Sequence, residues 1–323
     1  MKAFVTGGTG FIGSHVVDLL IENGHSVRLF SRHADLPVMW KGKDVVPVRG
    51  DLREPDTVLE AMEGADLVFH IGELRNMTAS DAGKNAAVVK KMAAELQHIG
   101  VKRFVFVSSL TVAGIPSTVP ATEETETAVV LRDQYTEYKR SAEAVIRELR
   151  NGVEHAILRP GIVYGPRSRH LGRMVNAVAR IGPIGIPFIG SGKTNAPLVH
   201  VRDLARAIYL AGIRPEGANQ TFNLTDGRAH TWFDLFTAIG KAQGKEVRLV
   251  PLPPVLFRLP AAFADLFAGI IGFNLDLHTY VTFLSRNVHF DMGKAKTLLG
   301  WGPEHGDLET AVREMVEWYG KQG

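Results

Sequence analysis

The sequence predicts an α/β fold, a doubly wound parallel sheet followed by a smaller mixed region. Apolar runs alternate with helical stretches through the first half of the chain, and this alternation is typical of a parallel sheet covered by helices on both faces. The runs expected to form strands are 2–6, 26–31, 45–48, 66–70, 103–108 and 154–158. The stretches with helical periodicity are 12–23, 55–63, 81–99 and 134–150.

After about residue 165 the pattern becomes mixed, so we expect one domain over residues 1–165 and a second region over 166–323. Helices are expected near 202–212, 232–243 and 307–319. The second of these begins with Thr231-Trp232-Phe233-Asp234. That sequence resembles a capping box in which Asp replaces the usual Glu or Gln.

Composition excludes several classes of protein. The 323 residues are 45% hydrophobic, which is ample for a core, and the absence of cysteine rules out disulfides and thiolate metal sites. The 12 histidines form no His-Glu-x-x-His motif, so we expect no metal. The net charge of +3 comes from scattered residues, which argues against nucleic-acid binding. A first strand that begins at residue 2 leaves no room for a signal peptide, and we expect a cytoplasmic protein.

A glycine-rich turn follows the first predicted strand. Its sequence is Gly7-Gly8-Thr9-Gly10-Phe11-Ile12-Gly13, and a helical stretch comes next. Such glycines permit a tight turn and close approach of backbone N–H groups to a pyrophosphate, while the helix N-terminus favours the anion. The spacing is Gly-x-x-Gly-x-x-Gly and not the Gly-x-Gly-x-x-Gly of the standard fingerprint. Because strand, turn and helix agree, the turn predicts dinucleotide binding.

Tyr135 and Lys139 form the candidate catalytic pair. They lie four residues apart in a helical stretch, so they share a face and the ammonium can lower the pKa of the phenol. Ser109 follows the buried strand 103–108 and can hydrogen-bond the same substrate oxygen that Tyr135 protonates. Tyr138 lacks a lysine four residues later. A lone Tyr-x-x-x-Lys pair also fits an exposed helix face, and the glycine turn is what favours catalysis.

Seven segments together carry a family resemblance that runs from Met1 to about Tyr319. They are Thr6-Gly7-Gly8-Thr9-Gly10-Phe11-Ile12-Gly13, Gly50-Asp51-Leu52, Asp66-Leu67-Val68-Phe69-His70, Ser108-Ser109, Tyr135 with Lys139, Arg159-Pro160-Gly161-Ile162-Val163-Tyr164-Gly165-Pro166 and Leu198-Val199-His200-Val201-Arg202-Asp203. In this order they resemble the extended short-chain dehydrogenases/reductases. That group includes nucleotide-sugar epimerases and dehydratases, and enzymes like dihydroflavonol 4-reductase and 3β-hydroxysteroid dehydrogenase.

The resemblance implies a Rossmann fold for residues 1–165. It implies that residues 166–323 fold over the carboxyl edge of the sheet and form most of the substrate pocket, with some segments returning to the sheet. It also implies that Asp51 accepts a hydrogen bond from the adenine amino group and that Lys139 binds the nicotinamide ribose hydroxyls. A homodimer through helices 81–99 and 134–150 is a further family expectation. The small-molecule substrate remains unidentified.

The residues expected to contact the cofactor come from the glycine turn, from the end of the second predicted strand and from the family resemblance. One departure from the family concerns Glu73, since relatives usually have His-Leu-Ala-Ala where this chain has His70-Ile71-Gly72-Glu73. Gly72 keeps the small size needed there, whereas Glu73 places a carboxylate near the pocket rim. The residues expected at the cofactor are Gly7, Thr9, Gly10, Phe11, Ile12, Gly13, Arg32, Asp51, Leu52, Gly72, Lys139 and Pro160.

The end of the second predicted strand indicates which dinucleotide binds. An acidic residue there would hold the ribose 2′-OH of NAD, whereas an Arg suits the 2′-phosphate of NADP. This chain has Ser31-Arg32, with no carboxylate before Asp35. We therefore predict NADP(H) over NAD(H). The alternative is that Arg32 stacks on adenine or faces solvent.

Two residues favour a reductase over a nucleotide-sugar epimerase. Sugar-nucleotide relatives commonly carry an Arg that contacts the sugar nucleotide, and our alignment places Ala196 at that position. Arg32 favours NADP, whereas an epimerase usually retains NAD. We predict that NADPH reduces an aldehyde or ketone of low polarity, with Tyr135 as proton donor. The alternatives left open are the epimerase, for which a basic cluster could replace the missing Arg, and a non-catalytic NADP sensor. The members of that cluster are Arg167, Arg169, His170 and Arg173.

Residues 252–273 are unusually hydrophobic. Pro254, Arg258, Pro260 and Asp265 interrupt the stretch, which is barely long enough to cross a bilayer. We therefore expect no integral membrane segment. The preferred interpretation is a helix packed on the domain core or lining the pocket, and the alternative is a membrane-surface helix.

Overall fold

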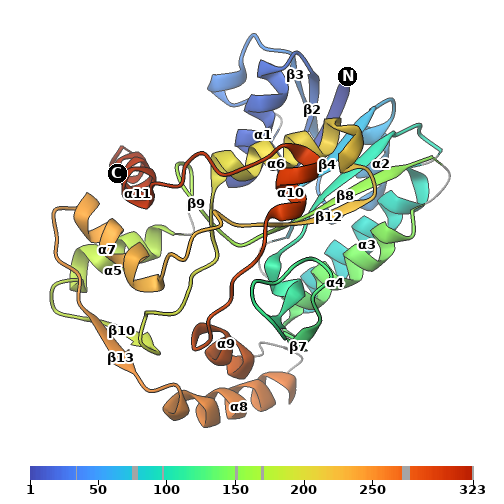
Figure 1. The fold of residues 1–323 in the computed structure, drawn as a ribbon. Helices are drawn as coiled ribbons and strands as arrows, with labels where there is room; N and C mark the ends of the chain where they lie inside the picture. The colour runs from blue at the N-terminus through green and yellow to red at the C-terminus, as the bar shows by residue number, and fades with distance from the viewer. Residues whose placement is uncertain are drawn as a thin grey trace.

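The computed structural model describes residues 1–33, 35–74, 79–96, 98–149, 152–168, 171–270 and 277–321. Seven parallel strands form the central sheet (Figure 1). In spatial order they are β12 (Gln220–Leu224), β8 (Glu154–Pro160), β5 (Arg103–Val107), β4 (Leu67–His70), β1 (Lys2–Thr6), β2 (Ser26–Ser31) and β3 (Val45–Arg49). The predicted fold class and all six predicted strands are confirmed, and β12 is the seventh.

Alternate residues of each strand belong to different cores, because successive side chains point to opposite faces of a sheet. Val5 and Val105 pack in the core that includes α1 (Phe11–Glu22) and α6 (Val201–Ile213). Phe4 and Phe104 pack in the core on the other face. Its helices are α2 (Pro55–Met62), α3 (Ala79–Glu95) and α4 (Gln134–Arg147). Burial on both faces explains why the strands read as continuous apolar runs.

A third core holds the later part of the chain together. Its helices include α7 (Trp232–Ala242) and α11 (Leu308–Gly320), as predicted from the sequence, together with α5 (Gly172–Ile181). The capping box is confirmed, since Thr231 Oγ1 accepts the Asp234 N–H at 3.1 Å and Asp234 Oδ2 accepts the Thr231 N–H at 2.8 Å. The remaining strands are β6 (Ile115–Pro116), β7 (Thr127–Val129), β9 (Ile162–Tyr164), β10 (Ile186–Ile189), β11 (Leu198–His200) and β13 (Leu249–Leu252).

The hydrophobic segment forms a helix at the periphery. Residues Val255–Ile270 are α8, and residues 271–273 of the predicted segment lie outside the described part of the chain. The main neighbour of α8 is α9 (Leu277–Leu284), and Val255 and Leu256 are exposed (Figure 1). The predicted place of this helix, on the domain core or lining the pocket, stays a prediction.

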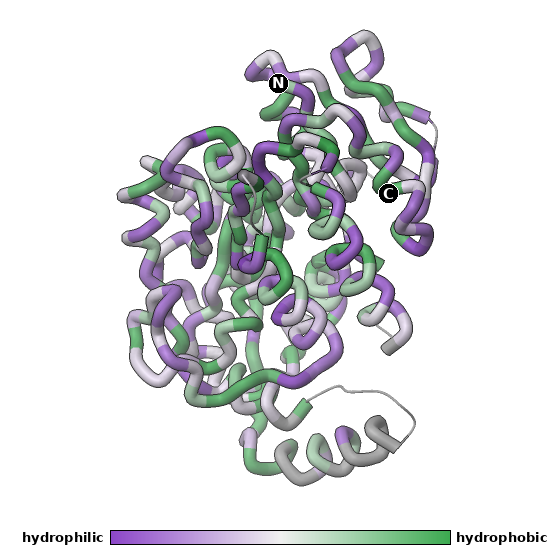
Figure 2. Tube along the Cα trace, turned by 90° about the vertical axis from the view of Figure 1, so that its right-hand side faces the viewer, coloured by the Kyte–Doolittle hydropathy of each residue, from purple (hydrophilic) through white to green (hydrophobic). Residues whose placement is uncertain are grey.

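Hydropathy follows the layers of the fold. Hydrophilic and hydrophobic residues alternate along the helices, which is the pattern of helices with one face on a core (Figure 2). Within the described part of the chain, no helix is both long enough and apolar enough to span a membrane.

Candidate active site

The strand order reverses beside β1. Its neighbours are β2 on one side and β4 on the other, so the chain crosses over after β3 and leaves a crevice at the carboxyl ends of β1 and β4. Ligands of open α/β sheets bind at such a switch point. Gly7 follows β1 and Gly72 follows β4, and a Cβ added to Gly7 would lie 2.5 Å from the Gly72 Cα. The two predicted cofactor residues therefore meet at the crevice.

The turn after β1 fits a pyrophosphate. Gly7 has a φ of +70°, which only glycine adopts readily, and α1 begins at Phe11 with no acidic residue in its first turn. An anion at this helix N-terminus would meet the positive end of the helix dipole and no opposing carboxylate in the first turn. Thr9, Gly10, Phe11, Ile12 and Gly13 all lie in this turn or the first turn of α1, as predicted.

Replacing Gly13 with Ala should weaken cofactor binding. The added Cβ would lie 2.2 Å from the Gly7 carbonyl oxygen, so the turn must move, at a cost of about 1–3 kcal/mol, or about 10- to 100-fold in affinity. Calorimetry with NADPH measures the change. Gly83→Ala in α3 is the control, because no heavy atom lies within 4 Å of its added Cβ. Equal affinities for the two variants would contradict the assignment of the turn.

Thr6 joins the ends of β1 and β4. Its Oγ1 lies 2.8 Å from His70 Nδ1 and accepts the Gly72 N–H at 3.1 Å. Burial and the nearby Lys139 charge lower the pKa of His70 to about 3, so this imidazole stays neutral. Thr6 was not predicted from the sequence to link the ends of these two strands.

The end of β2 presents Arg32 to solvent. Ser31 is buried and its Oγ accepts the His33 N–H at 3.2 Å, whereas Arg32 is exposed and forms no ion pair with any residue in the described ranges. Asp51 caps a turn, since its carboxylate accepts the Arg53 backbone N–H at 2.9 Å and pairs with the Arg53 guanidinium at 3.1 Å. The adenine role predicted for Asp51 remains untested.

Ser109, Tyr135 and Lys139 come together at the carboxyl edge of the sheet, beside the crevice. Ser109 follows the end of β5, and the Tyr135 hydroxyl shares a hydrogen bond with its side chain. Lys139 Nζ lies 5.5 Å from the centre of the Tyr135 ring. A residue that the sequence analysis missed orients the serine: the Thr111 N–H and hydroxyl donate to Ser109 Oγ at 3.2 and 3.0 Å. The Ser109 hydroxyl proton is therefore free to point at Tyr135 or at a substrate oxygen.

Lys139 is buried and held by two acceptors. Its Nζ donates to the Val107 carbonyl oxygen at 2.9 Å and lies 2.9 Å from Glu73 Oε2. The Glu73 carboxylate thus pairs with the candidate catalytic lysine. Tyr138, the neighbouring tyrosine, is buried in the core beneath α4 and packs on Phe106, as expected of a residue without a catalytic lysine.

The predicted lowering of the Tyr135 pKa is wrong for this structure. Burial raises the pKa of Tyr135 well above its usual value, and the Glu73 carboxylate raises it further, while the hydrogen bond from Ser109 acts in the opposite direction. The main physical reason is that burial disfavours the charged phenolate, and the Glu73 carboxylate, which pairs with Lys139, adds to this effect.

Asp133 begins the catalytic helix. Its Oδ1 accepts the Thr136 N–H at 3.1 Å and its Oδ2 accepts the Thr136 hydroxyl at 2.6 Å, which caps α4 one residue before Gln134. The Tyr280 hydroxyl of α9 donates to the same Oδ2 at 3.3 Å. This hydrogen bond joins α9, in the later part of the chain, to the start of α4.

Glu143 fixes the catalytic helix to the sheet. Ser108 Oγ donates to its Oε1 at 2.6 Å, and Arg159 of β8 donates through Nε to Oε1 at 2.9 Å and through a terminal nitrogen to Oε2 at 2.6 Å. Glu143 is almost fully buried and lies one helical turn beyond Lys139. The sequence gives no local sign of this pair, which joins residues 16 positions apart.

Three residues that bear on a sugar-nucleotide clamp are described by the structure: Ala196, Arg167 and Arg173. Ala196 is buried, and its N–H donates to the His230 carbonyl oxygen at 2.8 Å. Arg167 pairs with Asp18 at 2.8 Å, and Arg173 is exposed. Arg169 and His170 lie outside the described residues. Arg167 is therefore engaged by a carboxylate of α1.

One group of side chains has the composition of a metal site. The ligand atoms of His200, Asp203 and His305 lie within 4.8 Å of one another. Both carboxylate oxygens of Asp203 already accept backbone N–H groups, from Glu304 and His305 at 3.0 Å each. The arrangement acts as a clamp that holds the loop before α11 on α6.

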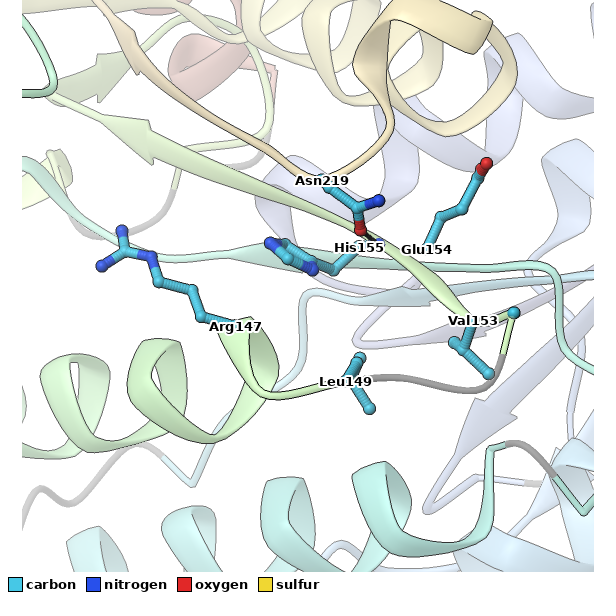
Figure 3. Close-up of a pocket in the computed structure, with 7 residues that line it drawn as sticks. Arg147, Leu149, Val153, Glu154, His155 and Asn219 are labelled. Carbon is cyan, nitrogen blue, oxygen red and sulfur yellow. Dashed lines mark hydrogen bonds between the residues drawn. The ribbon is translucent and has the colours of Figure 1, made fainter.

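A cavity of about 460 Å³ lies at the opposite edge of the sheet. Figure 3 shows it at the end of α4 and the start of β8, with Arg147, His155 and Asn219 around it. Tyr135 and Lys139 lie in the first half of α4, so this cavity is separate from the candidate active site.

The fold and site define the class of protein: a Rossmann-fold enzyme with a glycine turn for a nicotinamide dinucleotide and a Ser-Tyr-Lys group beside it. The chain belongs to the NAD dependent epimerase/dehydratase family, which matches residues 3–225. This is the family predicted from the sequence. Its members are enzymes that use a nicotinamide cofactor.

The chain is similar to enzymes of two kinds. The 3-beta-hydroxysteroid dehydrogenase of Mycolicibacterium neoaurum is 27% identical over 338 residues, which cover 98% of this chain and 91% of that protein. The UDP-glucose 4-epimerase of Vibrio cholerae is 26% identical over 311 residues, which cover 93% and 90%. The crystal structure of a UDP-glucose 4-epimerase from Thermotoga maritima with UDP-glucose matches with a TM-score of 0.76 and 25% identity, over 100% of this chain and 99% of that chain.

Proposed function

We propose that this protein is an NADP-dependent reductase of an aldehyde or ketone of low polarity. The observation that carries the proposal is the convergence of Ser109, Tyr135 and Lys139 beside the glycine turn. Arg32 at the end of β2 supports NADP, because an exposed guanidinium without a carboxylate partner suits a 2′-phosphate. The buried Ala196 supports a substrate other than a sugar nucleotide.

In the proposed reaction each residue acts once. A bound NADPH would supply the hydride to the carbonyl carbon. Ser109 donates a hydrogen bond to the substrate oxygen, since Thr111 occupies the acceptor side of its hydroxyl. Tyr135 donates its phenolic proton to the same oxygen as the alcohol forms. Lys139 holds the nicotinamide ribose, since the Val107 carbonyl oxygen accepts one hydrogen of its ammonium and the others can donate to the ribose hydroxyls.

Residues 166–323 supply most of the substrate pocket in this proposal, and residues 1–165 the cofactor site. The contact between Tyr280 and Asp133 supports it, because α9 then lies over the helix that carries Tyr135.

A membrane-surface role for α8 remains an alternative that co-sedimentation with lipid vesicles tests.

Replacing Arg32 with Ala should lower the affinity for NADP⁺ selectively. Hydrogen bonds to a charged group contribute about 1.5–3 kcal/mol, so we expect a loss of about 10- to 100-fold. The affinity for NAD⁺ serves as the internal control and should not fall. Calorimetry measures both, and comparable affinities of the unaltered protein for the two dinucleotides would defeat the cofactor assignment.

The second candidate is a nucleotide-sugar 4-epimerase, which the similarity to two UDP-glucose 4-epimerases favours. The two functions differ in what happens to the cofactor. Identification of any dinucleotide retained after purification, followed by an NADPH-oxidation screen over aldehydes, ketones and sugar nucleotides, separates them. Tightly retained NAD without net oxidation would favour the epimerase over the reductase.

A further inference from the structure

Glu73 is a charged residue that the proposed reaction does not use. It follows β4 and lies between two residues whose backbones are held in place. The Gly72 N–H donates to Thr6 Oγ1 at 3.1 Å. The Leu74 N–H donates at 2.9 Å to the Oδ1 of Asn85, a buried residue of α3. The Glu73 backbone is thus fixed next to the crevice.

The Glu73 side chain reaches the catalytic lysine from that position. Oε2 lies 2.9 Å from Lys139 Nζ, so the two opposite charges form an ion pair. The side chain of Lys139 is 4% exposed and that of Glu73 is 28% exposed, so solvent screens this pair only in part. An ammonium paired in this way offers little net positive charge to Tyr135, whose ring centre is 5.5 Å away.

We propose that Glu73 is a positioning residue that neutralises Lys139 and so keeps Tyr135 protonated, as a proton donor, into the alkaline range. The expected consequence is reduction over a wide pH range, and this consequence rests on the proposed function. A chain with Ala at this position would leave the Lys139 charge unopposed, and the phenolate of Tyr135 would form at lower pH. Glu73 therefore adapts the site to donate a proton.

Other ionisable groups also face Tyr135. The electrostatic effect of Glu73 on Tyr135 has the direction that the proposal requires, since it raises the pKa of the phenol, as do the Asp133 carboxylate and the Tyr280 phenol. The surrounding titratable groups are Glu73 after β4, His70 at the end of β4, Asp133, Tyr138 and Lys139 at or on α4, and Tyr280 on α9. Of the two carboxylates, Glu73 is the one that pairs with Lys139.

Replacing Glu73 with Gln tests the inference without turnover. The chain has six tyrosines, and protein labelled with ¹³C at tyrosine Cζ reports the ionisation of each by NMR; the signal lost in Tyr135→Phe identifies Tyr135. We expect Tyr135 of Glu73→Gln to ionise at least about one pH unit lower than in the unaltered protein, because a neighbouring charge moves a pKa by about 1–3 units. The alkaline limb of NADPH-dependent reduction should move down with it.

Two further variants make the result specific. Glu137→Gln removes an exposed carboxylate of α4. Because Glu137 pairs with Arg140 and not with Lys139, this variant should leave the ionisation of Tyr135 unchanged. Glu73→Asp keeps the negative charge. In this variant the pH at which Tyr135 ionises should be closer to that of the unaltered protein than in Glu73→Gln. The inference would be overturned if Tyr135 ionised at the same pH in the unaltered protein and in Glu73→Gln. It would also be overturned if Tyr135 of Glu73→Gln stayed protonated over the whole pH range of the titration. Neither result depends on hydride transfer, so the proposed function can fail separately.

Discussion

Replacing Tyr135 with Phe should lower turnover about 100- to 10,000-fold, which is the range that general acid catalysis contributes. The hydroxyl is the proton donor of the proposed reaction, and Phe keeps the ring over which Lys139 lies. Folding and NADPH affinity should therefore stay unchanged. Steady-state rates of NADPH oxidation and calorimetric titration measure the two properties separately.

Tyr138→Phe is the matched control for that prediction. Tyr138 lies on the same helix and is buried, but its hydroxyl has no hydrogen-bond partner within the described residues. We expect this variant to keep its activity. A fully active Tyr135→Phe protein would remove Tyr135 from the mechanism, whatever the substrate.

Replacing Glu143 with Ala should destabilise the fold by about 3–5 kcal/mol, because it leaves the buried guanidinium of Arg159 without its carboxylate. The loss should appear as a lower urea midpoint with an unchanged dependence on urea concentration. Activity should fall as well, since Glu143 also holds Ser108, the residue before Ser109.

Glu137→Ala is the control for Glu143, because Glu137 lies on the same helix and pairs with Arg140 at the surface. Its effect should stay within about 0.5 kcal/mol. Equal stability of the two variants would show that the ion pair beneath α4 contributes nothing to the fold.

The sheet and its helices could be predicted because their signals are local. Strands such as β1 and β5 are apolar on both faces, and helices such as α7 carry their own cap. The strand β12 was missed because its place depends on a partner more than 60 positions earlier, where Phe222 pairs with Leu158. Short paired strands such as β9 and β11 likewise depend on each other and not on their own sequences.

The candidate catalytic residues could be proposed from the sequence, whereas the groups that surround them could not. Ser109, Tyr135 and Lys139 stand in recognisable motifs. The contact between Glu73 and Lys139 joins residues 66 positions apart, and the Glu73 carboxylate adds to the burial that raises the pKa of Tyr135. The interaction of Tyr280 with Asp133 spans 147 positions and becomes visible only when α9 is placed over α4.

Transfer of deuterium from NADPH deuterated at nicotinamide C4 tests the central claim most directly. The substrate is an apolar ketone or aldehyde, and the deuterium is placed on each face of C4 in turn. We predict that deuterium from one of the two faces appears in the alcohol, at the former carbonyl carbon. One NADP⁺ should form for each alcohol. Mass spectrometry of the product measures both. An alcohol pool without deuterium, together with interconversion of UDP-sugars at constant cofactor content, would contradict the reductase and leave the epimerase in its place.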